Sequence, residues 1–236
     1  MIVIYDFDGT LTPYSLPQYE IIKKCGYNEE KLINRVAEEL TNSKGLYEAY
    51  YKCYTEILLE NNILLTKENV CLGADKVKFN NGVIEYFKNF QSRKTGVKHY
   101  IVTSGIKDYV NKTVIGKYVD GVYGVTFNEE NGIYKNIDKL VTDEKKVDAI
   151  KDIQLHNEGT NKIIYFGDGL TDELAFQYVH KIGGKNVFIA TKNESMETYK
   201  KLNVKGIIDK CFEPDFSMDS ELSKYIQTQI EEEKCK

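Results

Sequence analysis

The sequence predicts an α/β fold built on a parallel sheet, with a helical insertion near the start of the chain. From about residue 80 onward, short apolar runs that are typical of buried strands alternate with stretches of helical periodicity. This alternation favours strands that run parallel to one another. Residues 14–79 instead show helical spacing and no convincing strand pattern. We therefore expect a core α/β domain made of residues 1–13 and 80–236, and a helical domain over residues 14–79.

The first predicted strand is the apolar run 1–5, which leads directly into Asp6-Phe7-Asp8-Gly9-Thr10. Side chains two positions apart on an extended segment project to the same side. Asp6 and Asp8 can therefore converge at the carboxyl end of the sheet, where open α/β folds bind their ligands. Two such carboxylates repel each other unless a divalent cation or a shared proton relieves the repulsion. The alternative is an ordinary strand followed by an Asp-Gly turn.

Two helices are predicted within the insertion, one from Leu32 to Leu40 and one from Leu46 to Leu58, because their apolar residues keep helical spacing. The second helix is rich in tyrosine. Tyrosines that line a helix are more often core residues with a polar tip than a platform for substrate.

Beyond the insertion, helices and strands are predicted in alternation. In chain order they are a helix over 83–90, a strand over 99–102, a helix over about 107–118, extended segments at 122–127 and 132–135, a helix from Thr142 to about 153, a strand over 162–166, weaker strands at 186–190 and 204–208, and a helix in the last twenty residues. Asn131-Gly132, between the two extended segments, is typical of a hairpin turn.

Polar residues follow three of the predicted strands. They are Asp6 and Asp8 after the first, Thr103 and Ser104 after the second, and Asp168 and Asp172 after a later one. Because the strands are parallel, all of these ends lie at one edge of the sheet.

A lysine can join this group from the helix that begins at Thr142. Lys146 shares a helical face with Ile150 and Ile153, which we expect to be buried against the sheet, whereas Lys145 lies on a neighbouring face. We therefore prefer Lys146, although Lys145 can reach the same place.

Each of these residue types suits phosphoryl transfer. A carboxylate is a competent nucleophile towards phosphorus, and water can cleave the acyl phosphate that results. Magnesium held by oxygen ligands, together with a lysine, would neutralise the phosphoryl dianion. Thr103 can donate its hydroxyl to a phosphoryl oxygen, and Ser104 and Gly105 offer backbone amides at the start of the next helix. Asp8 is the second carboxyl group that such a reaction needs as general acid and then base.

The ordered set resembles that of the haloacid dehalogenase superfamily of phosphohydrolases. In that superfamily an Asp-x-Asp-Gly-Thr segment, a strand-ending Thr or Ser, a Lys and a Gly-Asp-x-x-x-Asp segment follow one another. The matching segments here are Asp6-Phe7-Asp8-Gly9-Thr10, Thr103, Lys146 and Gly167-Asp168-Gly169-Leu170-Thr171-Asp172. In this order and at these spacings the set is specific, whereas each member alone is weak.

The resemblance implies a Rossmann-like core and a role for each matching residue. Asp6 would be nucleophile and metal ligand, Asp8 would be acid and base with its backbone carbonyl on the metal, and Asp168 would be the third protein ligand. Asp172 would orient a metal-bound water or Lys146. The helical insertion is similar to the cap of the phosphoserine-phosphatase-like branch, which would close over the active site and select the leaving group.

Other readings of the motifs fit less well. Counted from Asp6, an EF-hand calcium loop would need Gly and Glu where Leu11 and Pro17 stand. A dinucleotide-binding loop starting at Gly167 would need a third glycine at position 172. Halide-displacing relatives lack the second acid of the first motif, so Asp8 argues against dehalogenation. A phosphotransferase or phosphomutase on the same core and a non-catalytic, metal-binding regulatory protein stay open.

The composition argues against nucleic-acid and membrane partners. The net charge is −4, and the 32 lysines and arginines form no block, which argues against a nucleic-acid partner. No apolar run approaches the roughly 18 residues that span a bilayer, and the first strand starts at Met1 with no room for a leader. The five cysteines show no Cys-x-x-Cys spacing and are expected to be reduced. We expect a cytoplasmic protein.

The expected function is magnesium-dependent hydrolysis of a small phosphorylated metabolite. Phosphoserine phosphatases use a glutamate shortly after the first motif and an arginine to hold the amino acid. Here Ser15 stands at the expected glutamate position, and Arg35 is the one arginine of the insertion. The substrate and the oligomeric state stay open.

Overall fold

The computed structural model describes the chain except residues 15–16, 18, 94–95, 160–161, 191–192 and 235–236. In the described part, seven strands form one sheet in the order β4-β3-β2-β1-β5-β6-β7. The strands are β1 (Ile2–Tyr5), β2 (Lys98–Ile106), β3 (Gly121–Glu130), β4 (Ile133–Lys139), β5 (Ile163–Gly167), β6 (Lys185–Ile189) and β7 (Lys210–Phe212). Neighbours are parallel except β3 and β4, which pair antiparallel. The parallel α/β fold predicted from the sequence is confirmed.

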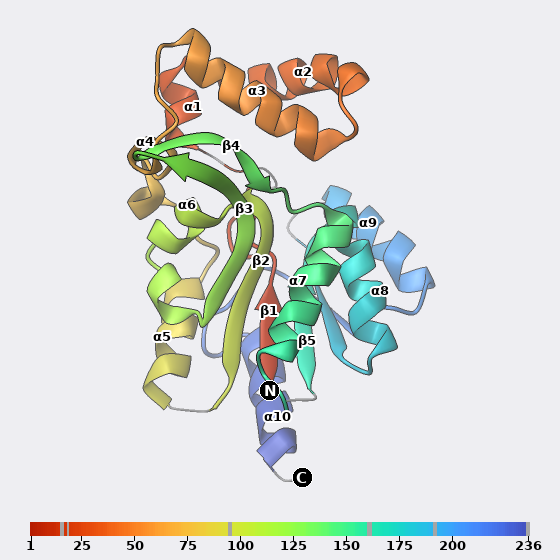
Figure 1. Ribbon diagram of the computed structural model, residues 1–236. Coiled ribbons are helices and arrows are strands. Elements are labelled where there is room, and N and C mark those ends of the chain that lie inside the picture. The colour runs from red at the N-terminus through yellow and green to blue at the C-terminus, as the bar shows by residue number, and fades with distance from the viewer. Residues whose placement is uncertain (15–16, 18, 94–95, 160–161, 191–192, 235–236) are drawn as a thin grey trace.

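Helices cover both faces of the sheet (Figure 1). One face packs against α5 (Val83–Arg93), α6 (Lys107–Lys112) and α10 (Glu221–Lys234), and the other against α7 (Asp143–Leu155), α8 (Glu173–Lys181) and α9 (Asn193–Val204). Successive side chains of β1 point to opposite faces of the sheet, so this strand contributes to both apolar cores. Val3 and Tyr5 contribute to the first core and Ile2 and Ile4 to the second, and all four side chains are fully buried.

A third group of helices lies beyond one end of the sheet, at the top of Figure 1. It comprises α1 (Glu20–Lys24), α2 (Glu29–Glu39), α3 (Leu46–Glu60) and α4 (Lys67–Val70), with 3-10 turns at Leu40–Asn42 and Ala74–Lys76. These helices have their own apolar core, which Ile106 and Val125 of the sheet complete. Tyr50, Tyr51 and Tyr54 of α3 are buried in it, so core packing accounts for most of the tyrosine-rich face.

One predicted strand is wrong. Residues 204–208 do not form a strand: α9 runs to Val204, which is 88% exposed, and Gly206 turns the chain at φ 68°. The last strand is β7, which pairs with β6. A short apolar run between two turns does not by itself distinguish a strand from the end of a helix.

Two other elements differ in length from the prediction. The helix expected over 107–118 ends at Lys112 and is followed by a separate 3-10 turn, Gly116–Tyr118. Strand β2 extends beyond Val102 to Ile106, with its pairing to β3 interrupted between those two residues. The predicted hairpin is confirmed, because Asn131 and Gly132 join β3 to β4 with φ values of 52° and 79°.

Among the described residues, no helix is long and apolar enough to cross a membrane. Cys25, Cys53, Cys71 and Cys211 are free thiols, while Cys235 and Ser15 lie outside the described residues.

Candidate active site

The register of the central strands brings the predicted site residues to one edge of the sheet. β1 lies between β2 and β5, with Tyr5 beside Ile101 on one side and Phe166 on the other. Asp6 comes next, and its backbone N–H donates to the carbonyl of Phe166 at 2.8 Å. Asp168 follows the end of β5 directly, so the two acids lie at neighbouring strand ends.

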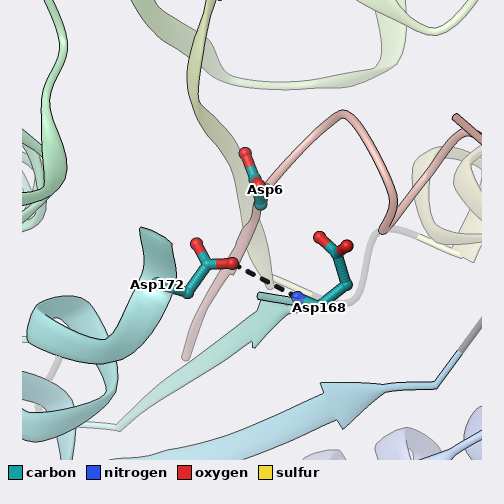
Figure 2. A group of neighbouring side chains, drawn as sticks. All are labelled: Asp6, Asp168 and Asp172. Atoms are coloured by element: carbon teal, nitrogen blue, oxygen red, sulfur yellow. Dashed lines mark hydrogen bonds between the residues drawn. The ribbon is translucent and has the colours of Figure 1, made fainter. Parts of the chain in front are cut away.

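Three carboxylates converge at this edge. Figure 2 shows Asp6 at the end of β1, Asp168 in the loop after β5 and Asp172 just before α8. One carboxylate oxygen from each residue lies within 4.8 Å of the others. The side chains of Asp6 and Asp172 are buried, so the group is held in the interior and is not a solvated acidic patch.

Asp172 is the most fully hydrogen-bonded member. Its Oδ1 accepts from Lys146 Nζ at 2.7 Å and from the hydroxyl of Tyr165 at 2.6 Å. Its Oδ2 accepts from the backbone amide of Asp168 at 3.2 Å (Figure 2). The same oxygen accepts from the backbone amide of Gly169 at 3.3 Å. Asp172 therefore fixes both the lysine and the loop that carries Asp168. Tyr165 was not predicted as a site residue. The one feature of the sequence that could have indicated it is a hydroxyl-bearing residue within an apolar strand.

Lys146 lies beside Asp6, whereas Lys145 points to solvent and pairs elsewhere. The Lys146 side chain is 1% exposed, and its Nζ is 3.2 Å from Asp6 Oδ2. Burial opposes the charge, but the attraction of Asp172 and Asp6 outweighs it and raises the pKa of Lys146. Lys145 is exposed and pairs with Asp148 at 2.9 Å. The helical-face argument therefore gave the correct placement, since Ile150 and Ile153 are fully buried on the face of Lys146.

Asp168 is positioned by the first motif. Thr10 Oγ1 donates to Asp168 Oδ1 at 3.3 Å, a contact that the sequence reading did not assign although Thr10 is part of the quoted motif. Gly9 has φ +81°, and a Cβ there would overlap the Asp168 carboxyl group. The glycine is thus required both by the turn and by the close approach of the acid.

Asp8 and Thr103 meet around Gly105. A Cβ at Gly105 would lie 3.2 Å from Thr103 Oγ1 and 3.4 Å from Asp8 Oδ2. The Gly105 amide donates to Thr103 Oγ1 at 2.9 Å, which leaves the threonine proton available to a ligand. The backbone carbonyl of Ser104 accepts from the Tyr51 hydroxyl at 2.7 Å, which ties this strand end to α3.

The electrostatics of the cluster favour a cation. Among the described lining residues, three carboxyl groups, those of Asp6, Asp8 and Asp168, accompany the single ammonium of Lys146, and the buried Asp172 adds a fourth behind them. Burial, reinforced by Asp172 and opposed by Lys146, raises the pKa of Asp6 to about 7. Burial followed by repulsion from Asp172 and Asp6 raises the pKa of Asp168 well above its usual range.

The donor set also fits a hard divalent cation. The cluster offers carboxylate oxygens, and magnesium prefers oxygen ligands. Asp172 is occupied by four donors, whereas Asp6 and Asp168 keep acceptor capacity.

A pocket of about 400 Å³ opens onto these groups. Asp6, Asp8, Thr103, Ser104, Gly105, Lys146 and Asp168 all line it, and Asp172 lies behind them. The rest of the lining comes mainly from α2, α3 and the loop after β5. Arg35 does not line the pocket; its guanidinium pairs with Glu60 at 2.6 Å and Glu56 at 3.2 Å.

The fold and the acid cluster define an α/β protein whose candidate active site lies at the carboxyl ends of parallel strands. The chain belongs to the haloacid dehalogenase-like hydrolase family, whose model matches residues 3–176.

Solved structures share the fold along nearly the whole chain. Phosphoserine phosphatase in its apo form is 20% identical with a TM-score of 0.63, and the match covers 96% of this chain and 97% of that one. A phospho-aspartyl intermediate analogue of phosphoserine phosphatase is 19% identical with a TM-score of 0.62 and the same coverage. A HAD family hydrolase from Salmonella enterica serovar Typhi is 16% identical with a TM-score of 0.64, covering 93% and 72% of the two chains. No curated protein sequence matches.

Proposed function

We propose that the protein is a magnesium-dependent phosphohydrolase that cleaves small phosphomonoesters through an aspartyl phosphate on Asp6. The observation that carries this proposal is the setting of Asp6. Asp6 lines the pocket together with Asp8, Thr103 and Asp168, and its Oδ2 lies 3.2 Å from Lys146 Nζ. The structural similarity to a phospho-aspartyl intermediate analogue of phosphoserine phosphatase supports the same choice of nucleophile.

The reaction divides between Asp6 and Asp8. A carboxylate oxygen of Asp6 attacks phosphorus, and the bond from phosphorus to the leaving oxygen breaks. Asp8 donates a proton to that oxygen, so the alcohol leaves uncharged. Asp8 then takes a proton from water as the water attacks the phosphoryl group on Asp6, which releases inorganic phosphate and restores both side chains. Burial, together with repulsion from Asp6, raises the pKa of Asp8 and so supports its role as the acid.

The remaining residues hold the phosphoryl group and the cation. Lys146 and the Thr103 hydroxyl would bind phosphoryl oxygens, with the strand end at Ser104 and Gly105 beside them. Asp6, Asp168 and the backbone carbonyl of Asp8 would hold Mg²⁺. When bound, Mg²⁺ neutralises phosphoryl charge and lowers the repulsion among the acids.

Residues 14–79 are proposed to act as a cap on a core formed by residues 1–13 and 80–236. Three described hydrogen bonds link the proposed parts near the site: Tyr47 donates to Asp143 at 2.6 Å, Tyr51 donates to the carbonyl of Ser104 at 2.7 Å, and the Ile106 amide donates to the Tyr19 hydroxyl at 2.8 Å. Because helices of the cap line the pocket, opening and closing of the cap would gate substrate entry and product release. The cytoplasmic location stays a prediction.

The test is phosphate release from a panel of phosphorylated amino acids, sugars, nucleotides and alcohols, with and without Mg²⁺. We expect release that needs Mg²⁺ and is lost in Asp6→Asn, with circular dichroism showing an intact fold. Transfer of the phosphoryl group to an added alcohol or sugar without net phosphate release would instead favour a phosphotransferase. Equal activity in Asp6→Asn would rule out the proposed nucleophile.

A further inference from the structure

We propose that the substrate's leaving group is an uncharged, apolar alcohol or phenol, bound against an aliphatic wall formed by α2 and the start of α3. This inference rests on the proposed phosphohydrolase function and adds the chemical class of the substrate.

The pocket has two chemically distinct ends. At one end are the acids, Lys146 and Thr103. The other end is aliphatic, and its side chains come from three segments: Ile33, Val36 and Leu40 on and after α2, Leu46 on α3, and Leu170 after β5. A phosphomonoester has the same division, with a charged phosphoryl group and a second group attached through the ester oxygen. When the phosphoryl group lies on Asp6, the leaving group extends towards the aliphatic end.

The aliphatic wall is exposed to solvent although it belongs to one pocket. Ile33, Leu40, Leu46 and Leu170 are 46%, 42%, 50% and 51% exposed. Single exposed aliphatic side chains are common on protein surfaces, but a group of them that converges within one cavity marks a binding site. An apolar ligand would remove this surface from water, which is favourable in proportion to the area covered.

No charged side chain of α2 or α3 is among the described residues that line the pocket. Arg35 pairs with Glu56 and Glu60, and Lys52 pairs with Glu39 at 2.7 Å. Among the described lining residues, the charged ones are Asp6, Asp8, Lys146 and Asp168, all at the catalytic end. The described wall therefore has no partner for the ammonium and carboxylate of an amino acid, and burying either group unpaired is costly.

Tyr50 supplies one polar contact for such a ligand. Its side chain lines the pocket and is 7% exposed, and its hydroxyl has no hydrogen-bond partner among the described residues. A buried hydroxyl without a partner carries an energetic penalty that a ligand oxygen can remove. We assign Tyr50 as a donor to an oxygen of the bound ester.

A competing explanation is that these aliphatic side chains do not contact the leaving group and only exclude water from the site, as a seal, when the cap moves towards Leu170. The two explanations differ in how activity depends on the leaving group. A wall that contacts the leaving group favours larger apolar groups, whereas a seal acts equally on all substrates.

The experiment measures kcat/KM for n-alkyl phosphates from ethyl to octyl, with phenyl phosphate, O-phosphoserine and glycerol phosphate as comparison substrates. We expect kcat/KM to rise by up to roughly fourfold per methylene, to level off once the pocket is filled, and to be lower for phosphoserine than for butyl phosphate. Highest activity on phosphoserine, with no dependence on alkyl length, would overturn the inference while leaving the proposed function intact.

Two variants distinguish a wall that contacts the leaving group from a seal that only excludes water. Ile33→Gln and Leu46→Gln should reduce the dependence on chain length, with little effect on ethyl phosphate and a large loss for hexyl phosphate. Leu59→Gln is the matched control, because Leu59 lies on α3, is 71% exposed and does not line the pocket. An equal loss for ethyl and hexyl phosphate in the wall variants would mean a seal and would overturn the inference.

If no substrate is hydrolysed, the proposed function fails and calorimetric binding tests the inference separately. Tighter binding of hexyl than of ethyl phosphate to the wild-type protein in Mg²⁺ would support the apolar site. Equal affinities would overturn it.

Discussion

At the scale of single residues, Lys146 and Asp172 determine the shape of the site. Lys146 is held between Asp6 and Asp172, and Asp172 in turn accepts from Tyr165 and the loop amides. A buried charge of this kind is stable only while it is paired and hydrogen-bonded. The lysine is therefore fixed in place before substrate arrives.

We expect Lys146→Ala to lower kcat by roughly 10²- to 10³-fold, the usual effect of removing one preorganised donor. The reason is that, among the described residues that line the pocket, Lys146 carries the one ammonium group. Steady-state kinetics of Lys146→Ala and Lys145→Ala, with unfolding midpoints for both, test this. A larger loss of kcat in Lys145→Ala would show that our assignment of the lysine is wrong.

His99 makes a second residue-scale prediction, about stability. It is buried among aromatic rings and its Nδ1 lies 3.0 Å from the Tyr5 hydroxyl. Burial lowers the pKa of His99 to about 4. Between the ordinary histidine pKa near 6.5 and this value, the unfolded chain binds a proton that the folded protein does not, so folding stability falls as the pH falls.

We expect the free energy of unfolding to drop between pH 7 and 4.5 by roughly 2–3 kcal/mol more in the wild type than in His99→Asn, since one pKa unit corresponds to about 1.4 kcal/mol. Urea denaturation at a series of pH values measures this difference. His156→Asn, at an exposed histidine, is the control. Identical pH profiles for wild type and His99→Asn would contradict the prediction.

At the scale of elements, α7 carries Lys146 to the site, and the start of α7 is fixed by its cap. Thr142 is extended, its Oγ1 accepts from the Lys145 amide at 3.4 Å, and the helix follows at Asp143. Ile150 and Ile153 then bury one face against the sheet. The orientation of this face determines which of two adjacent lysines reaches Asp6.

We expect Thr142→Ala to destabilise the protein by about 1 kcal/mol, a typical value for loss of an N-cap. Thr142→Ser should retain most of the stability because it keeps the accepting hydroxyl. Thermal unfolding of the three proteins is the measurement. Equal stability of Thr142→Ala and the wild type would mean that the cap contributes little to α7.

The same scale shows what the sequence could and could not predict. β1 and β5 were predictable because each is a continuous apolar run that ends in acids, and α7 was predictable from its cap and its periodicity. β7 was missed because three residues, Lys210–Phe212, pair with β6 through a long-range contact that leaves little local pattern. Likewise, the apolar spacing from Leu32 to Leu40 predicts a helix but does not say that its side chains line a pocket.

For the site, the order of motifs along the chain predicted which residues come together, but not their supporting contacts. Thr10 on Asp168 and Tyr165 on Asp172 are hydrogen bonds between segments far apart or on opposite sides of a turn. The Thr10 contact depends on the register of β1 beside β5, and the Tyr165 contact depends on the turn that follows β5. No local pattern reveals either one.

At the scale of the whole molecule, the sheet edge carries an excess of buried acid that a cation would neutralise. The pKa values of Asp6, Asp8 and Asp168 are all raised, with burial as the first cause. Binding of a cation to the folded state alone stabilises that state by mass action.

We expect saturating Mg²⁺ to raise the Tm of the wild type by several degrees, since a ligand at 100 times its Kd contributes about 2.7 kcal/mol. In Asp168→Asn the rise should be lost. Asp148→Asn, at an exposed acid that pairs with Lys145, should respond as the wild type does. Differential scanning calorimetry with and without Mg²⁺ measures these changes in Tm. If Mg²⁺ raises the Tm of Asp168→Asn as much as that of the wild type, Asp168 is not a metal ligand.

The most direct measurement of the central claim is to trap the covalent intermediate. Enzyme is mixed with a substrate found by phosphate release, quenched in acid during turnover, and digested for peptide mass analysis. We expect a phosphoryl group on Asp6 that forms only with Mg²⁺, and that accumulates in Asp8→Asn when the substrate is an aryl phosphate whose leaving group needs no proton from Asp8. A phosphoryl group on another residue, or steady phosphate release with an Asp6 that is never phosphorylated, would contradict nucleophilic catalysis by Asp6.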